Sequence, residues 1–369
     1  MSVTIFTMTH KKFPTPGDPV YVPLQVGRAG KEYLGYIGDD TGVSISEKNC
    51  YYGELTGVYW VWKNIRTTDY VGICHYRRYF CTEEGRILTK WEYEEILSDH
   101  DIITSKLLKL NFSYYEGYAG DYNIHDLNVV GEVIREAYPA YYETFEKLVH
   151  SKGTYFGNMM VCKKEIYDAY CEWLFGIFEK AEGKIDASGY DDYHKRVYGF
   201  ISEFLLYVWT KVQGLKVYEC KVGMTDEKRE TAEIKDRLAE YFAKKDIAGA
   251  KEYMLACLKK RPDVLMEASD ITGELKMSMQ VIAVCELEKQ AYGSSTIDRI
   301  QDFGQLMAHF QKLNDLIQGW KERETEMSPS EVEFYLKNEN ITDIALEASA
   351  RLFYPAAEAA QIASELFLL

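Results

Sequence analysis

Residues 68–80 read TDYVGICHYRRYF, and this stretch decides how the first half of the chain is interpreted. Its segment 70–74 is apolar and rich in strand-forming residues, as a buried strand would be. The segment continues without a turn signal into four polar residues, His75, Tyr76, Arg77 and Arg78. Ligands of α/β folds bind beyond the carboxyl ends of parallel strands, so we expect these side chains to lie near a site.

The cationic end of this strand suits an anionic ligand. Guanidinium groups match phosphate oxygens in a two-pronged fashion, and two of them would stabilise the charge that a diphosphate gains as it leaves. Because side chains alternate along a strand, we expect His75 and Arg77 to face one side, and Tyr76 and Arg78 to face the other. The alternative is that one arginine points away and forms a surface ion pair.

Strand-like and helix-like segments alternate around this strand. A β-like run at 3–8 precedes it, helix-like segments at 51–64 and 91–98 flank it, and a second β-like run follows at 100–106. Further along, the pattern predicts helices at 125–149 (broken near Pro139), 163–181 and 198–213, and strands at 156–162 and 215–222. This alternation predicts an α/β fold with a mainly parallel sheet flanked by helices, in a first domain of residues 1–228.

Beyond this region the pattern changes to helices alone. Segment after segment carries a helical apolar stripe and ends at Gly, Pro or polar residues. We therefore expect an α-helical C-terminal domain over residues 229–369.

The composition argues against several classes of protein. The formal net charge of −15 disfavours a nucleic-acid-binding surface. No window approaches the roughly 20 apolar residues of a membrane span. None of the eight cysteines forms a CxxC pair, so we expect reduced thiols in a cytoplasmic protein. The dinucleotide fingerprint, the P-loop, the serine-hydrolase elbow and the HExxH zinc motif are all missing from the sequence, which disfavours the enzymes that use them.

Two glutamates are candidates for acid–base chemistry. Glu203 is a lone carboxylate in an apolar helix-like segment, where burial would raise its pKa and suit it to general-base catalysis. The alternative for Glu203 is a surface position on the helix. Glu54 lies inside the helix predicted at 51–64, where it is equally well explained as a buried structural acceptor or as an acceptor-site residue.

Three polar residues in loops and at strand ends each have two possible roles. Asp39 and Asp40 could bind a divalent ion or hydroxyl groups, but Asp-Thr-Gly is also good turn chemistry. Asn158, at the mouth of the strand predicted at 156–162, could contact a sugar or satisfy backbone groups.

Three segments together resemble one bacterial glycosyltransferase family. They are VPLQVG…LGYIGDDTGVSISEKNCYYGELTGVYWVWKN, DYVGICHYRRYF, and the later pair GNMMVCKKEIYDAYCEWLF and RVYGFISEFLLYVW. The family was long described as a domain of unknown function (DUF4422-type), is found in capsular and exopolysaccharide gene clusters, and has been associated with galactofuranosyl transfer. The resemblance covers residues 2–222 and leaves the helical C-terminal part uncovered.

The resemblance implies a GT-A-like fold with a nucleotide-sugar site at the strand ends. Members of that superfamily usually carry Asp-x-Asp at a strand mouth, where a metal grips the donor diphosphate. Here the comparable strand ends in HYRRYF, so the cationic side chains are expected to take the place of the metal. A Mn²⁺ or Mg²⁺ ion on another loop, at Asp39 and Asp40 or at Asp191 and Asp192, stays open.

The implied activity is the transfer of a hexose, with galactofuranose as first candidate, from a UDP-sugar to a glycan acceptor on a lipid carrier, in capsular, exopolysaccharide or O-antigen synthesis. Such a protein would act in the cytoplasm, at the inner face of the membrane, with peripheral membrane association or a homodimer left open and no nucleic-acid partner. Two alternatives remain. One is a phosphotransferase or nucleotide hydrolase that uses the same cationic strand end, and the other is a non-catalytic scaffold that binds glycans or partners.

The resemblance also assigns roles to residues. The catalytic base is sought among Glu203, Asp191, Asp192 and Glu54. The donor nucleotide and its diphosphate would be held by Thr9, His10, His75, Tyr76, Arg77 and Arg78. Sugar hydroxyls would contact Asp39, Asp40, Asn49, Trp60 and Asn158.

Overall fold

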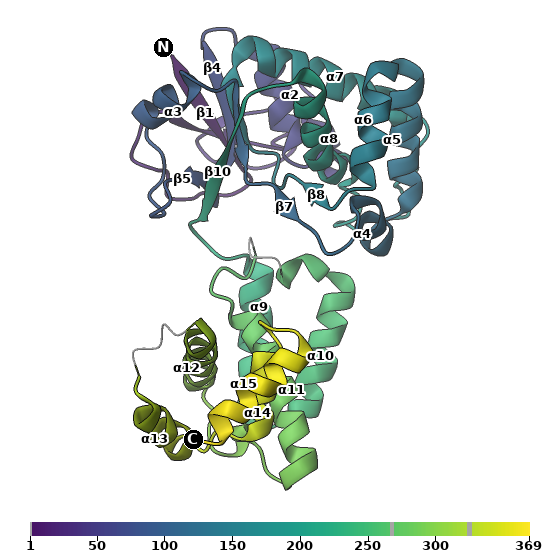
Figure 1. Cartoon of the computed structure of the whole chain (residues 1–369). Coiled ribbons are helices and arrows are strands. Elements are labelled where there is room, and N and C mark those ends of the chain that lie inside the picture. The colour runs from purple at the N-terminus through teal and green to yellow at the C-terminus, as the bar shows by residue number, and fades with distance from the viewer. Residues whose placement is uncertain (1, 266–268, 323–326) are drawn as a thin grey trace. The chain divides into compact units, whose positions relative to one another are not determined.

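The computed structural model describes residues 2–265, 269–322 and 327–369 (Figure 1). The chain divides into two compact units, unit 1 (Met1–Thr225) and unit 2 (Asp226–Leu369). The sequence placed this boundary after residue 228, against residue 225 in the structure. Each unit is described by itself.

Unit 1 is built around an eight-stranded sheet. Apart from β5, its strands follow the order β3-β2-β1-β4-β9-β6-β10, in which β9 is antiparallel to both neighbours and the other pairs are parallel. β5 is antiparallel to both β4 and β10. The bounds are β1 (Val3–Thr9), β2 (Tyr21–Gln25), β3 (Ile37–Gly38), β4 (Tyr70–His75), β5 (Arg78–Cys81), β6 (Ile102–Ser105), β9 (Met160–Lys163) and β10 (Val217–Met224), with β7 (Leu108–Lys109) and β8 (Gly153–Thr154) in a separate pair. The observed unit has the predicted α/β class, but its sheet is mixed instead of mainly parallel, because β5 and β9 each run antiparallel to both of their neighbours.

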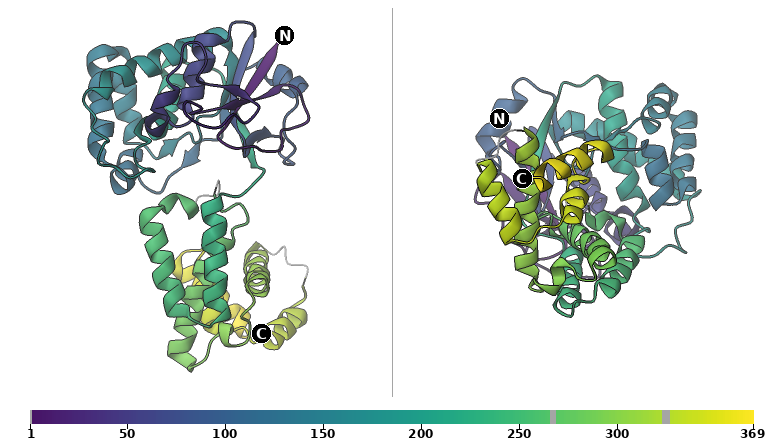
Figure 2. Two further views of the ribbon diagram at one scale, coloured as in Figure 1. Left: turned by 180° about the vertical axis from the view of Figure 1, so that it is seen from behind. Right: turned by 60° about the horizontal axis from the view of Figure 1, so that its bottom comes forward.

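Helices cover both faces of this sheet (Figures 1 and 2). The helices of unit 1 are α1 (Asn49–Tyr52), α2 (Leu55–Asn64), α3 (Lys90–Leu97), α4 (Tyr114–Asp121), α5 (Ile124–Ala137), α6 (Pro139–Val149), α7 (Lys164–Glu182) and α8 (Val197–Gln213). A large core packs Val71 and Ile73 of β4 against α2 and α5–α8. A smaller core packs Cys74 against Tyr93 and Leu97 of α3 on the other face. β4 is therefore buried on both sides, which accounts for its continuous apolar sequence.

Two local predictions in unit 1 were wrong. The helix expected at 51–64 is interrupted, because Gly53 adopts a φ of 56°, which only glycine takes readily, so α1 ends at Tyr52 and α2 begins at Leu55. Glu54 therefore precedes α2 instead of lying inside a helix. The sequence also missed β2, whose internal proline and loop-like surroundings hid its strand character.

Unit 2 is α-helical in the residues that the structure describes. Its helices are α9 (Arg229–Ala243), α10 (Ile247–Lys260), α11 (Glu274–Tyr292), α12 (Phe303–Glu322), α13 (Pro329–Asn338), α14 (Asp343–Ala350) and α15 (Ala356–Phe367). Their apolar core encloses a closed polar network, in which Gln280 Nε2 donates to Asn314 Oδ1 (2.8 Å) and to Ser349 Oγ (2.6 Å). Nowhere in the described ranges is a helix both long and apolar enough to cross a bilayer.

Candidate functional site

Several strand ends meet at one edge of the sheet in unit 1. β1 and β4 end there because they are parallel, and β9 begins there because it runs antiparallel to β4, with Ile73 paired to Met160. Gly157 and Asn158 precede β9 and so lie beside His75, the last residue of β4. The His75 Nε2 atom is 2.5 Å from the carbonyl oxygen of Gly157.

The cationic run forms a tight hairpin at this edge. His75 ends β4 and is paired with Arg78, which begins β5, so Tyr76 and Arg77 form the turn. Directly opposed residues of an antiparallel pair point to the same face. The predicted alternation is therefore wrong, because it assumed a straight strand end: His75 and Arg78 share a side instead of lying on opposite ones.

Two helices that begin beside this hairpin complete the site. Glu54 is the residue before α2, Arg196 is the residue before α8, and Glu203 lies about two turns into α8. The charges of Glu54, Arg78 and Arg196 all act on the Glu203 carboxyl. We call the following residues the charged cluster: Glu54, His75, Arg77, Arg78, Arg196 and Glu203.

Two groups of the charged cluster titrate far from their usual ranges. Glu203 is partly exposed, but desolvation by the residues packed around its carboxyl, reinforced by the nearby Glu54 carboxylate and opposed by Arg78, raises its pKa to about 8. Burial also lowers the pKa of His75 to about 4, with Glu54 opposing the shift and Arg78 adding to it. At neutral pH, Glu203 therefore carries a proton in most molecules and His75 is neutral. The direction of this shift for Glu203 is the one that the sequence predicted.

Two arginines of the charged cluster hold donors without acceptors. Arg77 Nη1 and Arg196 Nε are buried and have no hydrogen-bond partner within the described part of the chain. The Arg77 guanidinium lies 5.4 Å from the Tyr76 ring centroid, and the Arg196 guanidinium lies 5.4 and 5.2 Å from the rings of Tyr193 and Phe200. A buried donor without a partner is costly, so these two nitrogens are available to donate hydrogen bonds to a ligand.

Asn158 forms hydrogen bonds with Glu54 and with the first turns of α8. Its side-chain amide donates to Glu54 Oε1 (2.7 Å) and to the Gly199 carbonyl (3.0 Å), and its Oδ1 accepts from Ser202 Oγ (2.7 Å). Its backbone adopts a φ of 49°, which is uncommon outside glycine. Asn158 was expected to bind sugar, but in this structure its amide links Glu54 to the start of α8.

More positive charge lies on the β1 side of the hairpin. The His10 ring packs edge-on against Tyr76 with centroids 5.3 Å apart. Desolvation by its surroundings lowers the pKa of His10, and the charges of Lys11 and Lys31 lower it further. Thr9 Oγ1 donates to the carbonyl of Lys11 (2.5 Å), so this side chain shapes the turn that carries His10.

Asp39 lies in the loop between β3 and α1 and is fully buried. Its two oxygens accept from the backbone N–H groups of Gly27 (2.8 Å) and Arg28 (3.0 Å) and from the hydroxyls of Ser46 (2.5 Å) and Thr56 (2.6 Å). These four hydrogen bonds give the carboxylate a full set of internal donors. It is not a member of the charged cluster.

The other predicted sugar-binding residues also have internal partners. Asp40 forms an ion pair with Arg28 (2.8 Å). Asn49 Nδ2 donates to the carbonyl of Gly53 (2.6 Å), and the Trp60 indole N–H donates to a loop carbonyl 2.8 Å away. Asp40 and Trp60 are therefore engaged by neighbouring loops, whereas Asn49 binds the residue directly before Glu54 of the charged cluster.

Asp191 and Asp192 precede α8 on the surface. The Asp191 carboxylate accepts from the backbone N–H of His194 and lies 2.7 Å from its Nδ1, whereas Asp192 is fully exposed. Among the residues that the structure describes, no three His, Cys, Asp or Glu side chains are grouped closely enough to hold a metal ion.

Sequence reasoning missed Arg196 and Gly157. Arg196 lies seven residues before Glu203, a spacing that places both on one face of a helix, and this signal could have identified it. Gly157 offered no such signal, because its backbone meets His75 only through the pairing of β4 with β9.

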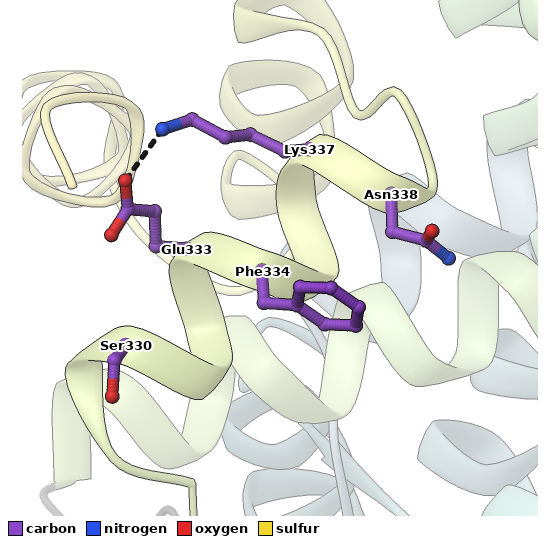
Figure 3. Close-up of a pocket in the computed structure, with 5 residues that line it drawn as sticks. All are labelled: Ser330, Glu333, Phe334, Lys337 and Asn338. Atoms are coloured by element: carbon purple, nitrogen blue, oxygen red, sulfur yellow. Dashed lines mark hydrogen bonds and ion pairs between the residues drawn. The ribbon is translucent and has the colours of Figure 1, made fainter.

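Unit 2 has a shallow hollow of its own on α13, lined by Ser330, Glu333, Phe334, Lys337 and Asn338 (Figure 3). An ion pair joins Lys337 to Glu333 (2.5 Å), and the Phe334 side chain is largely exposed. The charged cluster, with its shifted pKa values and unpaired donors, is the stronger candidate for chemistry.

Comparison with known proteins places this site in a family. A family described as a domain of unknown function, DUF4422, matches residues 4–214. The chain belongs to the DUF4422 family. The match runs from β1 to the end of α8 and so contains every residue of the charged cluster.

The DUF4422 chain is also similar to a solved structure, the apo form of the bifunctional glycosyltransferase WbbM. The two share 31% sequence identity with a TM-score of 0.55, over 62% of this chain and 46% of the WbbM chain. The DUF4422 chain therefore spans less than half of the WbbM chain that it matches. A search of curated proteins found no match.

Proposed function

We propose that the chain is a glycosyltransferase that moves a hexose from a UDP-sugar to a glycan acceptor. The observation that carries this proposal is the placement of Arg78 and Arg196 around Glu203, with Arg77 beside Arg78, at the carboxyl edge of the sheet. Arginines suit a diphosphate, and a carboxylate of raised pKa suits the removal of a proton from a hydroxyl group. Membership of the DUF4422 family and the likeness to the glycosyltransferase WbbM support the proposal.

The arginines would stabilise the leaving group. As the bond between the anomeric carbon and the diphosphate oxygen breaks, negative charge grows on the diphosphate. The unpaired donors of Arg77 and Arg196 can bind the oxygens that gain this charge. His10 and Tyr76, on the β1 side, would contact the nucleotide.

Glu203 would act as the base. In a direct displacement, the acceptor hydroxyl attacks the anomeric carbon while its proton passes to the Glu203 carboxylate. A pKa near 8 gives the ionised form a strong affinity for that proton. Glu54 is the second candidate, since it lies beside Glu203 and is held by Asn158. Asp191 and Asp192 follow, because the structure places them on the surface.

Finer features of the proposal come from the family resemblance. They are a GT-A-like fold, galactofuranose as the first donor sugar to test, a lipid-carried acceptor of capsular, exopolysaccharide or O-antigen synthesis, and action at the inner face of the membrane. A divalent ion at Asp39 is disfavoured, since that carboxylate already accepts four hydrogen bonds. The cationic side chains would neutralise the diphosphate in place of such an ion.

A thermal-shift screen followed by product analysis tests the proposal. The protein is melted with a panel of UDP-hexoses, each with Mn²⁺ and with EDTA, and the donor that stabilises it most is then incubated in labelled form with octyl glycosides. Glycosyl transfer yields UDP and a longer glycoside. Free sugar as the only labelled product would indicate a hydrolase, labelled phosphate on the acceptor would indicate a phosphotransferase, and no stabilisation by any donor would favour a scaffold.

A further inference from the structure

The start of α8 presents one partly exposed face. Arg196, Phe200 and Glu203 follow the spacing i, i+4, i+7 and therefore lie on the same side of the helix. All three are partly exposed, while residues 197–199 and 201–202 are buried. Phe200 consequently lies between a guanidinium and the proposed base, about one turn before Glu203.

Aromatic rings gather around Phe200. Its ring centroid is 4.8 Å from that of Tyr122 and 5.0 Å from that of Tyr193, and the ring of His194 lies 5.6 Å from Tyr122. Each of these four rings is partly exposed. We call Tyr122, Tyr193, His194 and Phe200 the aromatic wall.

Hydrogen bonds hold the aromatic wall in place. The hydroxyl oxygens of Tyr122 and Tyr193 are 3.2 Å apart. The two ring nitrogens of His194 lie 2.7 Å from Asp191 Oδ2 and 3.1 Å from the carbonyl of Asp121. Rings fixed in this way lose little side-chain entropy when a ligand packs on them.

We propose that the aromatic wall binds the acceptor saccharide and presents one of its hydroxyl groups to Glu203. This inference rests on the proposed function. A sugar ring offers a C–H face that packs on aromatic rings and hydroxyl groups that bind the polar rim of a site. The wall has such a rim in its two tyrosine hydroxyls and the Asp191 carboxylate. Arg196 links the wall to the charged cluster, because its guanidinium rests on Tyr193 and Phe200 while its charge acts on Glu203.

A nucleobase is the competing occupant of the wall, and the structure offers it a different place. Phe13 packs against Tyr76 and Tyr36, with ring centroids 6.0 and 5.8 Å apart, on the β1 side of the hairpin. That group lies with His10, where the donor nucleotide is proposed to bind. The wall lies instead on the helix that carries the proposed base, which is where an acceptor is needed.

Saturation-transfer NMR with octyl β-D-galactopyranoside, below its micelle concentration and with UDP present, tests the inference. We compare wild type, Phe200→Ala, Tyr193→Ala, the conservative Phe200→Tyr, and Trp91→Ala. The last is a matched control, because Trp91 is 67% exposed and belongs to α3, which packs on the other face of the sheet. UDP affinity is measured by calorimetry on the same samples, and thermal melting checks that each variant is folded.

We expect Phe200→Ala and Tyr193→Ala to weaken glycoside binding by about tenfold or more, or about 1.4 kcal/mol, because a ring that packs on the sugar is lost, with UDP affinity unchanged. Phe200→Tyr and Trp91→Ala should bind as wild type does. The inference is overturned if folded Phe200→Ala keeps its glycoside affinity, or if UDP affinity falls in parallel, which would make the wall a nucleobase site. It is also overturned if wild type binds neither this glycoside nor its glucose and mannose counterparts. Glycoside binding without any UDP binding would instead contradict the proposed donor.

Discussion

Two carboxylates of unit 1, Asp39 and Glu203, have opposite surroundings. Asp39 accepts four hydrogen bonds from its own loops and is complete without a ligand. Glu203 is surrounded by charges instead: desolvation raises its pKa to about 8, and Arg77 and Arg196 nearby keep buried donors unpaired. The comparison teaches that a carboxylate whose oxygens all accept internal hydrogen bonds is typical of a structural role. A carboxylate of shifted pKa beside arginines with unpaired donors is instead typical of a ligand site.

The largest expected effect is on the functional side of this comparison. Glu203→Gln should lower glycosyl transfer by about 10³-fold, because it removes the proposed base and changes little else. The melting temperature and the UDP affinity should stay near those of wild type. Turnover is measured with the donor identified in the thermal-shift screen. Wild-type turnover in folded Glu203→Gln would transfer the role of base to Glu54.

Asp39→Ala tests the structural side. It leaves two backbone N–H groups and two hydroxyls without their acceptor, so we expect the free energy of unfolding to fall by about 3 kcal/mol. Chemical denaturation measures this loss. The neighbouring Asp40→Ala is the matched control, because its surface ion pair should contribute at most about 1 kcal/mol. At a temperature where the variant is folded, UDP affinity should be unchanged, and its loss would place Asp39 in the donor site.

Arg77→Ala should cut turnover by about 10²-fold, since it removes a donor that stabilises the leaving diphosphate. Arg77→Lys should recover only part of the rate, because an ammonium group lacks the guanidinium fork. Arg66→Ala serves as a control, because Arg66 is exposed and pairs with a residue outside the charged cluster: its Nη1 atom lies 3.8 Å from Asp168 Oδ2. Equal rates for Arg77→Ala and Arg66→Ala would remove Arg77 from the mechanism.

The smallest expected effect is a pH dependence of stability. The pKa of Glu203 is raised from 4.5 to about 8 in the folded chain, so its contribution to stability is lost as pH rises between these values. The pKa of His75 is lowered from 6.5 to about 4, so its contribution grows as pH rises over that range. Below pH 6.5 the contributions of Glu203 and His75 to the free energy of unfolding change in opposite directions. Between pH 6.5 and pH 8 only the Glu203 contribution changes, and it should lower the free energy of unfolding by at most about 2 kcal/mol. Urea unfolding of wild type and Glu203→Gln at the two ends of this range measures the difference, and equal slopes would contradict the assignment.

The sequence predicted the separate parts of the candidate site better than their assembly. A buried strand that runs into cationic residues predicted β4 and its charged end, and a lone carboxylate in an apolar helix predicted the shifted pKa of Glu203. The hairpin that turns Arg78 to the side of His75 depends on strand pairing. The contact of His75 with Gly157 joins residues 82 positions apart. No local pattern encodes either one.

The role of Asp39 could not be predicted from its local sequence either. Its Asp-Asp-Thr-Gly context predicts a turn or an ion site, and both readings are reasonable from local chemistry. The donors that decide the matter come from Gly27, Ser46 and Thr56, which only the folded chain brings around one carboxylate.

The arrival of two helix starts at one edge of the sheet has a consequence for experiments on the arginines. Aligned peptide dipoles place roughly half a positive charge at the first turn of α2 and of α8, and no side-chain exchange removes it. A variant without Arg77, Arg78 and Arg196 should therefore retain a residual attraction for UDP. That remainder measures what the main chain contributes, and it sets the baseline against which each guanidinium is to be judged.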